Sequence, residues 1–158
     1  MQKPSSPQLP EAELSDEGDM TDLLGELRVL LPTAQLLSAF LITVPFMPGF
    51  AAIAYSEKYV FLATFMLAIG SLVLLSAPAV QHRLIRPLSN RARFKAFASR
   101  QIVIGSVALA AALVSGTQLV LSTTFGHGVG TVAGAFIAAL ILAVWWWLPR
   151  RWKRAGEL

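Results

Sequence analysis

Four runs of apolar residues, each close to the length needed to cross a bilayer, constrain this chain more than any other feature. The runs cover about residues 29–46, 59–80, 101–121 and 128–148, and none of them contains Asp, Glu, Lys or Arg. A helix needs about 20 consecutive apolar residues to cross the hydrocarbon core of a membrane. The sequence therefore predicts an all-α fold, an integral membrane four-helix bundle.

The overall composition agrees with a membrane protein. Of the 158 residues, 55% are hydrophobic and 14% are charged, and the mean hydropathy is +0.61. Soluble domains carry about 25% charged residues. The net charge of +4 comes from side chains that flank the apolar runs, so we expect the lipid bilayer, and no nucleic acid, as the partner of these charges.

Lysine and arginine are distributed unevenly among the connecting segments. Six lie between the second and third runs and four in the C-terminal tail, whereas the first loop holds only Lys58 and the third loop holds none. Because basic residues stay on the cytoplasmic side, both termini and the second loop are predicted to be cytoplasmic. An even number of spans also requires the termini to share a side. Four tryptophans would then mark the inner interface: Trp145, Trp146, Trp147 and Trp152.

The chain divides into a tail, a membrane domain and a second tail. Residues 1–18 are rich in Pro, Ser and Glu, which predicts a disordered acidic cytoplasmic tail. Leucines at helical spacing over 19–31 predict an amphipathic helix in the inner interface, bending into the first span near Pro32. The membrane domain is expected to cover 19–150, followed by a basic cytoplasmic tail over 151–158.

The loops between the spans give further expectations. We expect the second span to end at Pro78. Residues 50–55 are too apolar for a solvated loop, and either rest on the outer leaflet or cap the bundle. The third loop is short enough to make the last two spans an antiparallel hairpin.

Small residues recur every four positions at the start of the last span, where they lie on one helix face: Gly126, Gly130, Gly134 and Ala138. This spacing lets two helix backbones approach closely. The expected partner is the third span, through Gly105, Ala112 and Gly116; a homo-oligomer interface is the main alternative, and the lining of a channel is another.

Polar side chains within the spans form two groups. Gln35 and Ser38 lie near the inner end of the first span, and Ser115 and Gln118 near the outer end of the third. At opposite depths they cannot form one midplane substrate site of the kind transporters use. We interpret them as interhelical hydrogen-bonding groups, worth about 0.6–2 kcal/mol each.

The spans lack the groups that catalysis or proton coupling requires. Proton-coupled transport normally uses an ionisable group within the membrane. The sequence has no cysteine, no catalytic triad and no phosphate-binding loop, and its two histidines are predicted on opposite sides. We therefore expect no enzyme activity, no cofactor and no metal site.

Charges at the inner ends of the first two spans suggest a contact between them. We hypothesise that Glu26 pairs with Arg83 or Arg86 and holds the amphipathic helix beneath the bundle. The basic loop and tail could also bind anionic lipids, at about 1 kcal/mol for each well-placed cation.

Two stretches together carry a family resemblance. The first is Glu26-Leu27-Arg28, continuing through Gln35 and Phe40 to Val44-Pro45-Phe46; the second is Ala77-Pro78-Ala79-Val80-Gln81-His82-Arg83, followed by Ile85-Arg86. They resemble a family of small bacterial four-helix membrane proteins of unknown function, common in actinobacteria, over about residues 22–150. Only position 85, where that family is expected to carry an aromatic residue, departs from the pattern.

The resemblance implies a location and a set of residues. It implies the bacterial plasma membrane, and some members of that family are described as sodium:proton antiporters. Established antiporters are larger and place carboxylates in the membrane, which this chain does not. The resemblance draws attention to an inner polar clasp, comprising Glu26, Arg28, His82, Arg83 and Arg86.

The leading interpretation is a non-enzymatic membrane protein that acts through helix packing, as a homo-oligomer or as an accessory subunit of another membrane protein. The alternative is a small ion transporter or channel assembled as an oligomer.

Overall fold

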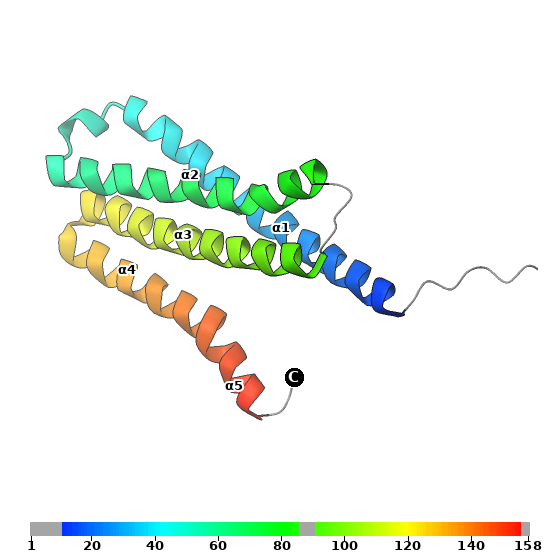
Figure 1. Ribbon diagram of the computed structural model, residues 1–158. Helices are drawn as coiled ribbons and strands as arrows, with labels where there is room; N and C mark the ends of the chain where they lie inside the picture. Colours follow the sequence, from blue (N-terminus) through cyan, green and yellow to red (C-terminus); the bar gives the residue numbers. More distant parts are fainter. Residues whose placement is uncertain (1–10, 86–90, 156–158) are drawn as a thin grey trace, which may run out of the picture.

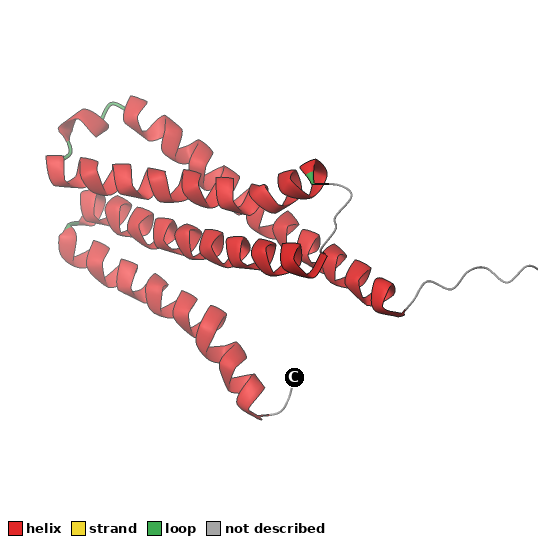
Figure 2. Ribbon diagram, viewed as in Figure 1, coloured by secondary structure: helices red, strands yellow, loops and turns green. Residues whose placement is uncertain are grey.

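The computed structural model describes residues 11–85 and 91–155, and every regular element in these two ranges is helical (Figures 1 and 2). Four long helices alternate with short turns: α1 (Glu11–Thr43), α2 (Tyr55–Leu84), α3 (Arg91–Phe125) and α4 (His127–Leu142). Two 3₁₀ turns, η1 (Val44–Phe46) and η2 (Phe50–Ala52), connect α1 to α2. A π-helical segment, η3 (Ala143–Trp147), continues α4 into α5 (Leu148–Ala155).

Four stretches of these helices are long and apolar enough to cross a membrane, namely Gly25–Phe46, Tyr55–Leu84, Arg93–Phe125 and His127–Arg154. Each includes one of the four apolar runs, so the predicted all-α four-helix architecture is confirmed. The helices extend beyond the apolar runs, so charged residues such as Arg83 and Arg93 lie at their ends.

The helices α1, α2 and α3 pack around a shared core, whereas α4 packs against α3 (Figure 1). The core has two clusters of buried side chains. The first comprises Leu27, Ala34, Leu75, Ala98, Ile102 and Leu109, and the second comprises Leu41, Phe61, Ala68 and Ala112. Among the described elements α4 contacts only α3 and η3, and Figure 1 shows it diverging from α3 towards α5.

The N-terminal part of α1 differs from the expectation of a disordered tail. Residues 11–18 form the first turns of α1, which begins eight residues before the predicted start, and residues 1–10 lie outside the described part. Glutamate, alanine and leucine favour helix, and carboxylates near a helix N-terminus interact favourably with its dipole.

The predicted interfacial helix is not a separate element. The helix α1 continues through Pro32, and Leu27, which is 2% exposed, packs with Ala98 and Ile102 of α3. Leu30 and Leu31 pack against the same cluster, so the described part of the leucine face packs against protein rather than against lipid. An amphipathic pattern alone does not distinguish the two, because both offer an apolar surface.

The second span also continues through its proline. Pro78 is buried inside α2, which ends six residues later at Leu84. Prolines are tolerated in membrane-spanning helices when side-chain hydroxyls satisfy freed carbonyl groups nearby. Pro78 lacks the amide hydrogen that would bond to the carbonyl of Leu74, and next to this position Leu75 is fully buried in the first core cluster.

The short segment between α1 and α2 caps the bundle, one of the two alternatives expected from its sequence. The ring of Phe50 meets the ring of Phe61 edge-on, with 5.0 Å between their centroids. Both side chains belong to the second core cluster or pack against it.

Candidate functional site

The glycine face of α4 forms a close seam with α3. Gly130 and Gly134 are buried, and a Cβ atom added at Gly130 would lie 2.7 Å from the carbonyl oxygen of Gln118 and 2.8 Å from the amide nitrogen of Ser122. At Gly134 an added Cβ would meet the Cβ of Gln118 at 3.2 Å. Ala138 is half-buried further along the helix. Backbone atoms of α3 therefore exclude a side chain at Gly130, whereas at Gly134 a methyl group would require the side chain of Gln118 to shift by a few tenths of an ångström.

Gly126 has a different role from the other members of the stripe. It is exposed, it has a φ of +94°, and it connects α3 to α4. A residue with a Cβ adopts this conformation only at a cost, so glycine is required by the turn rather than by helix packing.

The small residues expected to meet this stripe lie instead towards α2. A Cβ added at Gly105 would lie 3.0 Å from the Cγ of Leu75, and one at Gly116 would lie 3.6 Å from Thr64. Ala112 belongs to the second core cluster, together with Phe61 of α2. The spans therefore pack through two separate small-residue seams, one on each side of α3.

Of the predicted polar residues, Ser115 makes an interhelical hydrogen bond. The hydroxyl of Thr64, on the fully buried face of α2, donates to the Ser115 Oγ at 2.9 Å. Ser115 in turn donates to the carbonyl of Ala111 at 2.8 Å. Thr64 was not singled out from the sequence, where a lone threonine in an apolar run carries no signal of its partner.

The two predicted polar residues of α1 point in different directions. Ser38 is 3% exposed, and its hydroxyl has no hydrogen-bond partner among the described residues, whereas Gln35 is exposed. Ser38 lies between Ala34 of the first cluster and Leu41 of the second. A serine on α2, Ser71, occupies the corresponding place between Ala68 and Leu75, so small polar residues separate the two clusters.

Four of the five clasp residues lie in the described ranges, and they do not form one cluster. Glu26, Arg28 and Arg83 are exposed, and within the described ranges no ion pair joins Glu26 to Arg28 or to Arg83. His82 is half-buried, with its ring 6.0 Å from that of Phe94 on α3. Arg86 lies outside the described residues.

Instead, Glu26 lines a groove of about 650 Å³ that opens where α4 diverges. Its walls come from α1, α3 and the end of the fourth span: Glu26, Val29, Leu30, Ile102, Val103, Ser106, Val107, Val144, Trp145, Trp146 and Pro149. Arg83 lines a different hollow, with Ala79, Val80 and Leu84 of α2. Among the described residues that line this groove Glu26 alone is charged, so the groove is apolar with one carboxylate at its wall.

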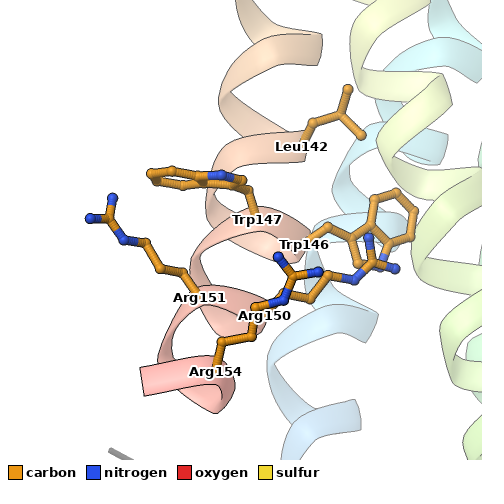
Figure 3. Close-up of a pocket in the computed structure, with 6 residues that line it drawn as sticks. All are labelled: Leu142, Trp146, Trp147, Arg150, Arg151 and Arg154. Atoms are coloured by element: carbon orange, nitrogen blue, oxygen red, sulfur yellow. The ribbon is translucent and has the colours of Figure 1, made fainter. Parts of the chain in front are cut away.

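A second hollow, of about 600 Å³, adjoins this groove at the C-terminal end of the fourth span (Figure 3). It is lined by Leu142, Trp146, Trp147, Arg150, Arg151 and Arg154. The guanidinium of Arg151 lies 5.2 Å from the ring centre of Trp147, a cation–π contact. Trp146 lines both hollows, which makes them neighbours.

No three His, Cys, Asp or Glu side chains of the described part gather as metal ligands would. The polar groups that the structure does assemble are hydroxyls, one carboxylate and three arginines. Such groups can form hydrogen bonds and bind a charged headgroup.

The comparison with known families agrees with the resemblance seen in the two motif stretches. The profile of DUF6328, a family of unknown function, matches residues 15–149. This chain belongs to that family. The match begins in the second turn of α1 and ends at Pro149, so it covers the four apolar runs and includes the glycine seam and the apolar groove. No curated protein and no solved structure matches the chain.

Proposed function

We propose that this DUF6328 protein is a multi-pass plasma-membrane protein, with both termini cytoplasmic, that acts through helix packing rather than by catalysis. Its functional form would be a homo-oligomer, or one copy held as an accessory subunit of another membrane protein. The four apolar helices support membrane insertion, and the uneven distribution of basic residues supports the orientation.

The observation that carries the packing proposal is the uncovered outer face of α4. In the most apolar window of the fourth span 11% of residues are buried, against 28% in the second and third spans. Val132, Phe136 and Leu140, spaced four apart, are 72%, 66% and 49% exposed. This ridge lies opposite the glycine seam, and its spacing suits the ridge-and-groove packing of a further helix.

Cysteine cross-linking in membranes tests this proposal, because the chain has no native cysteine. A single Phe136→Cys variant is expected to form disulfide-linked dimers on mild oxidation. The matched control is Val73→Cys, which places a cysteine at a position of α2 that is 60% exposed. Equal cross-linking at both positions, or none at Phe136→Cys with no other protein captured, would contradict the proposed interface.

One observation favours the alternative of ion transport. Glu26 is a carboxylate on the wall of a groove, which is the kind of group that an ion path requires. Sodium and proton fluxes in liposomes distinguish the two functions. The packing proposal predicts no flux above that of empty liposomes, whereas flux that Glu26→Gln abolishes would establish transport.

A further inference from the structure

The apolar groove and the arginine-lined hollow meet at Trp146, and together they have the chemistry of a phospholipid. The hollow presents three guanidinium groups, and its described lining contains no carboxylate. The groove beside it is lined mainly by valine, leucine, isoleucine and tryptophan. We propose that the two form one site for an anionic phospholipid, with the headgroup phosphate on Arg150 and Arg154 and an acyl chain in the groove.

The arginines are placed to bind a phosphodiester from one side. Arg150 and Arg154 are four residues apart on α5 and are therefore neighbours on its surface. In Figure 3, Arg150 extends towards Trp146, while Arg151 lies with Trp147 on the other side of the helix. Guanidinium groups bind phosphate oxygens in a bidentate manner, so this pair can hold a headgroup that a single cation would not fix.

The apolar groove provides the binding site for the acyl chain. Val103 and Val107 of α3 and Val144 of η3 are among the apolar residues that line it. An apolar space of about 650 Å³ open to the bilayer would be filled by hydrocarbon. An acyl chain attached to a headgroup at Arg150 enters this space without leaving the membrane.

The charge balance favours an anion over a lipophilic cation. Glu26 is the single carboxylate of the groove, and it is outnumbered by the three arginines of the adjoining hollow, which leaves two excess positive charges. Each cation near the membrane surface increases the affinity for an anionic lipid by about fivefold.

The π-helical turn brings the two halves of the site together. Within η3, Trp145 and Trp146 line the groove while Trp146 and Trp147 line the arginine hollow. Single π-helical turns inside α-helices are frequent at functional sites. Indole rings also favour the depth of lipid headgroups, which places this site at the interface.

The inference rests on the proposed membrane insertion, and quenching of tryptophan fluorescence by brominated lipids tests the two separately. All four tryptophans lie between residues 145 and 152, so the intrinsic fluorescence of the full chain reports on this end alone. The protein would be placed in phosphatidylcholine vesicles in which either phosphatidylglycerol or part of the phosphatidylcholine carries brominated acyl chains, at equal mole fraction. We expect stronger quenching by brominated phosphatidylglycerol.

Two variants test which residues bind the headgroup and which bind the acyl chain. Replacing Arg150 and Arg154 by glutamine should reduce the preference for phosphatidylglycerol by about fivefold for each arginine. The matched control, R83Q/R100Q, removes the same charge from two exposed positions of α2 and α3, and should keep the preference. Val107→Phe fills the groove and leaves the arginines in place, so it should reduce quenching by brominated chains.

Three results would contradict the proposed lipid site. These are equal quenching by both lipids in the parent protein, an equal loss of preference in the control variant, and unchanged quenching in Val107→Phe. Displacement of the lipid by free glycerol phosphate at a concentration equal to that of the lipid would also overturn it, because the acyl chain would then contribute nothing to the affinity. Absence of quenching by either lipid would contradict membrane insertion itself, a result distinct from the others.

Discussion

Thr64 and Ser115, 51 residues apart in the chain, are joined by a hydrogen bond of 2.9 Å between their hydroxyl oxygens. The bond connects α2 to α3 beside the second core cluster, where Thr64 is fully buried. Within the membrane such bonds contribute about 0.6–2 kcal/mol, because the unfolded chain in lipid also finds partners.

Thr64→Val is therefore expected to lower the free energy of unfolding by about 1 kcal/mol. The change preserves the shape of the side chain and removes its hydroxyl. Unfolding in mixed micelles with increasing denaturing detergent measures the effect. The control is Thr123→Val, since Thr123 is exposed and donates only to carbonyls of its own helix; an equal loss in both variants would contradict a specific interhelical contribution.

Gly130→Ala is expected to destabilise the chain by about 1–3 kcal/mol, the cost of overpacking. The added methyl group would meet backbone atoms of Gln118 and Ser122, which cannot move aside as a flexible side chain would. Gly128→Ala makes the same change two residues earlier, where nothing lies within 4 Å of an added Cβ. Equal melting temperatures for the two variants would show that α4 does not approach α3 at Gly130.

Gly126→Ala is expected to cost about 1–3 kcal/mol because of backbone strain at a φ of +94°. The comparison is Gly49→Ala in the first loop, where φ is −76° and there is open space around the added Cβ. That second change should be neutral or slightly stabilising, since alanine restricts the unfolded chain more than glycine does. Thermal unfolding of both variants measures the difference, and the prediction fails if Gly49→Ala is the more damaging one.

Ser38→Ala is expected to leave the free energy of unfolding unchanged or to raise it by up to about 1 kcal/mol, because the buried hydroxyl finds no partner in the described structure. Ser115→Ala, an identical change in size, removes the bond from Thr64 and those that Ser115 donates to carbonyls of its own helix, and should destabilise the chain. A loss at Ser38 as large as that at Ser115 would show that the Ser38 hydroxyl is hydrogen-bonded in the membrane.

The spans could be predicted from the sequence because length and the absence of charge together determine them. The contacts between the helices could not be predicted in the same way. Small residues four apart on α4 indicated a close helix approach, but they did not show that Gly130 would meet Gln118 rather than Gly116. The spacing of residues along one helix predicts which face of that helix is packed. It does not predict how the neighbouring helix is rotated about its own axis, and so which of its residues meet that face.

Charge patterns at the ends of the apolar runs predict an orientation in the membrane, but they did not predict which charged residues lie together. Glu26 and Arg83 are placed at the same end of the molecule by their positions in the chain, yet they line different hollows. The leucines around Leu27 were similarly ambiguous, since an apolar face packs against lipid and against a helix by the same physical effect. Continuation of α1 and α2 through their prolines could not be inferred, because it depends on the packing around those positions.

The mass of the complex extracted in native lipid nanodiscs tests the central claim most directly, since no detergent disturbs the contacts between spans. Protein packed through the outer face of α4 is predicted to give particles holding two or more copies, or one copy with a second membrane protein. Charging that face with Phe136→Glu should reduce these particles to single copies, whereas Val73→Glu on α2 should not. Particles holding one copy alone in the parent protein would contradict the account.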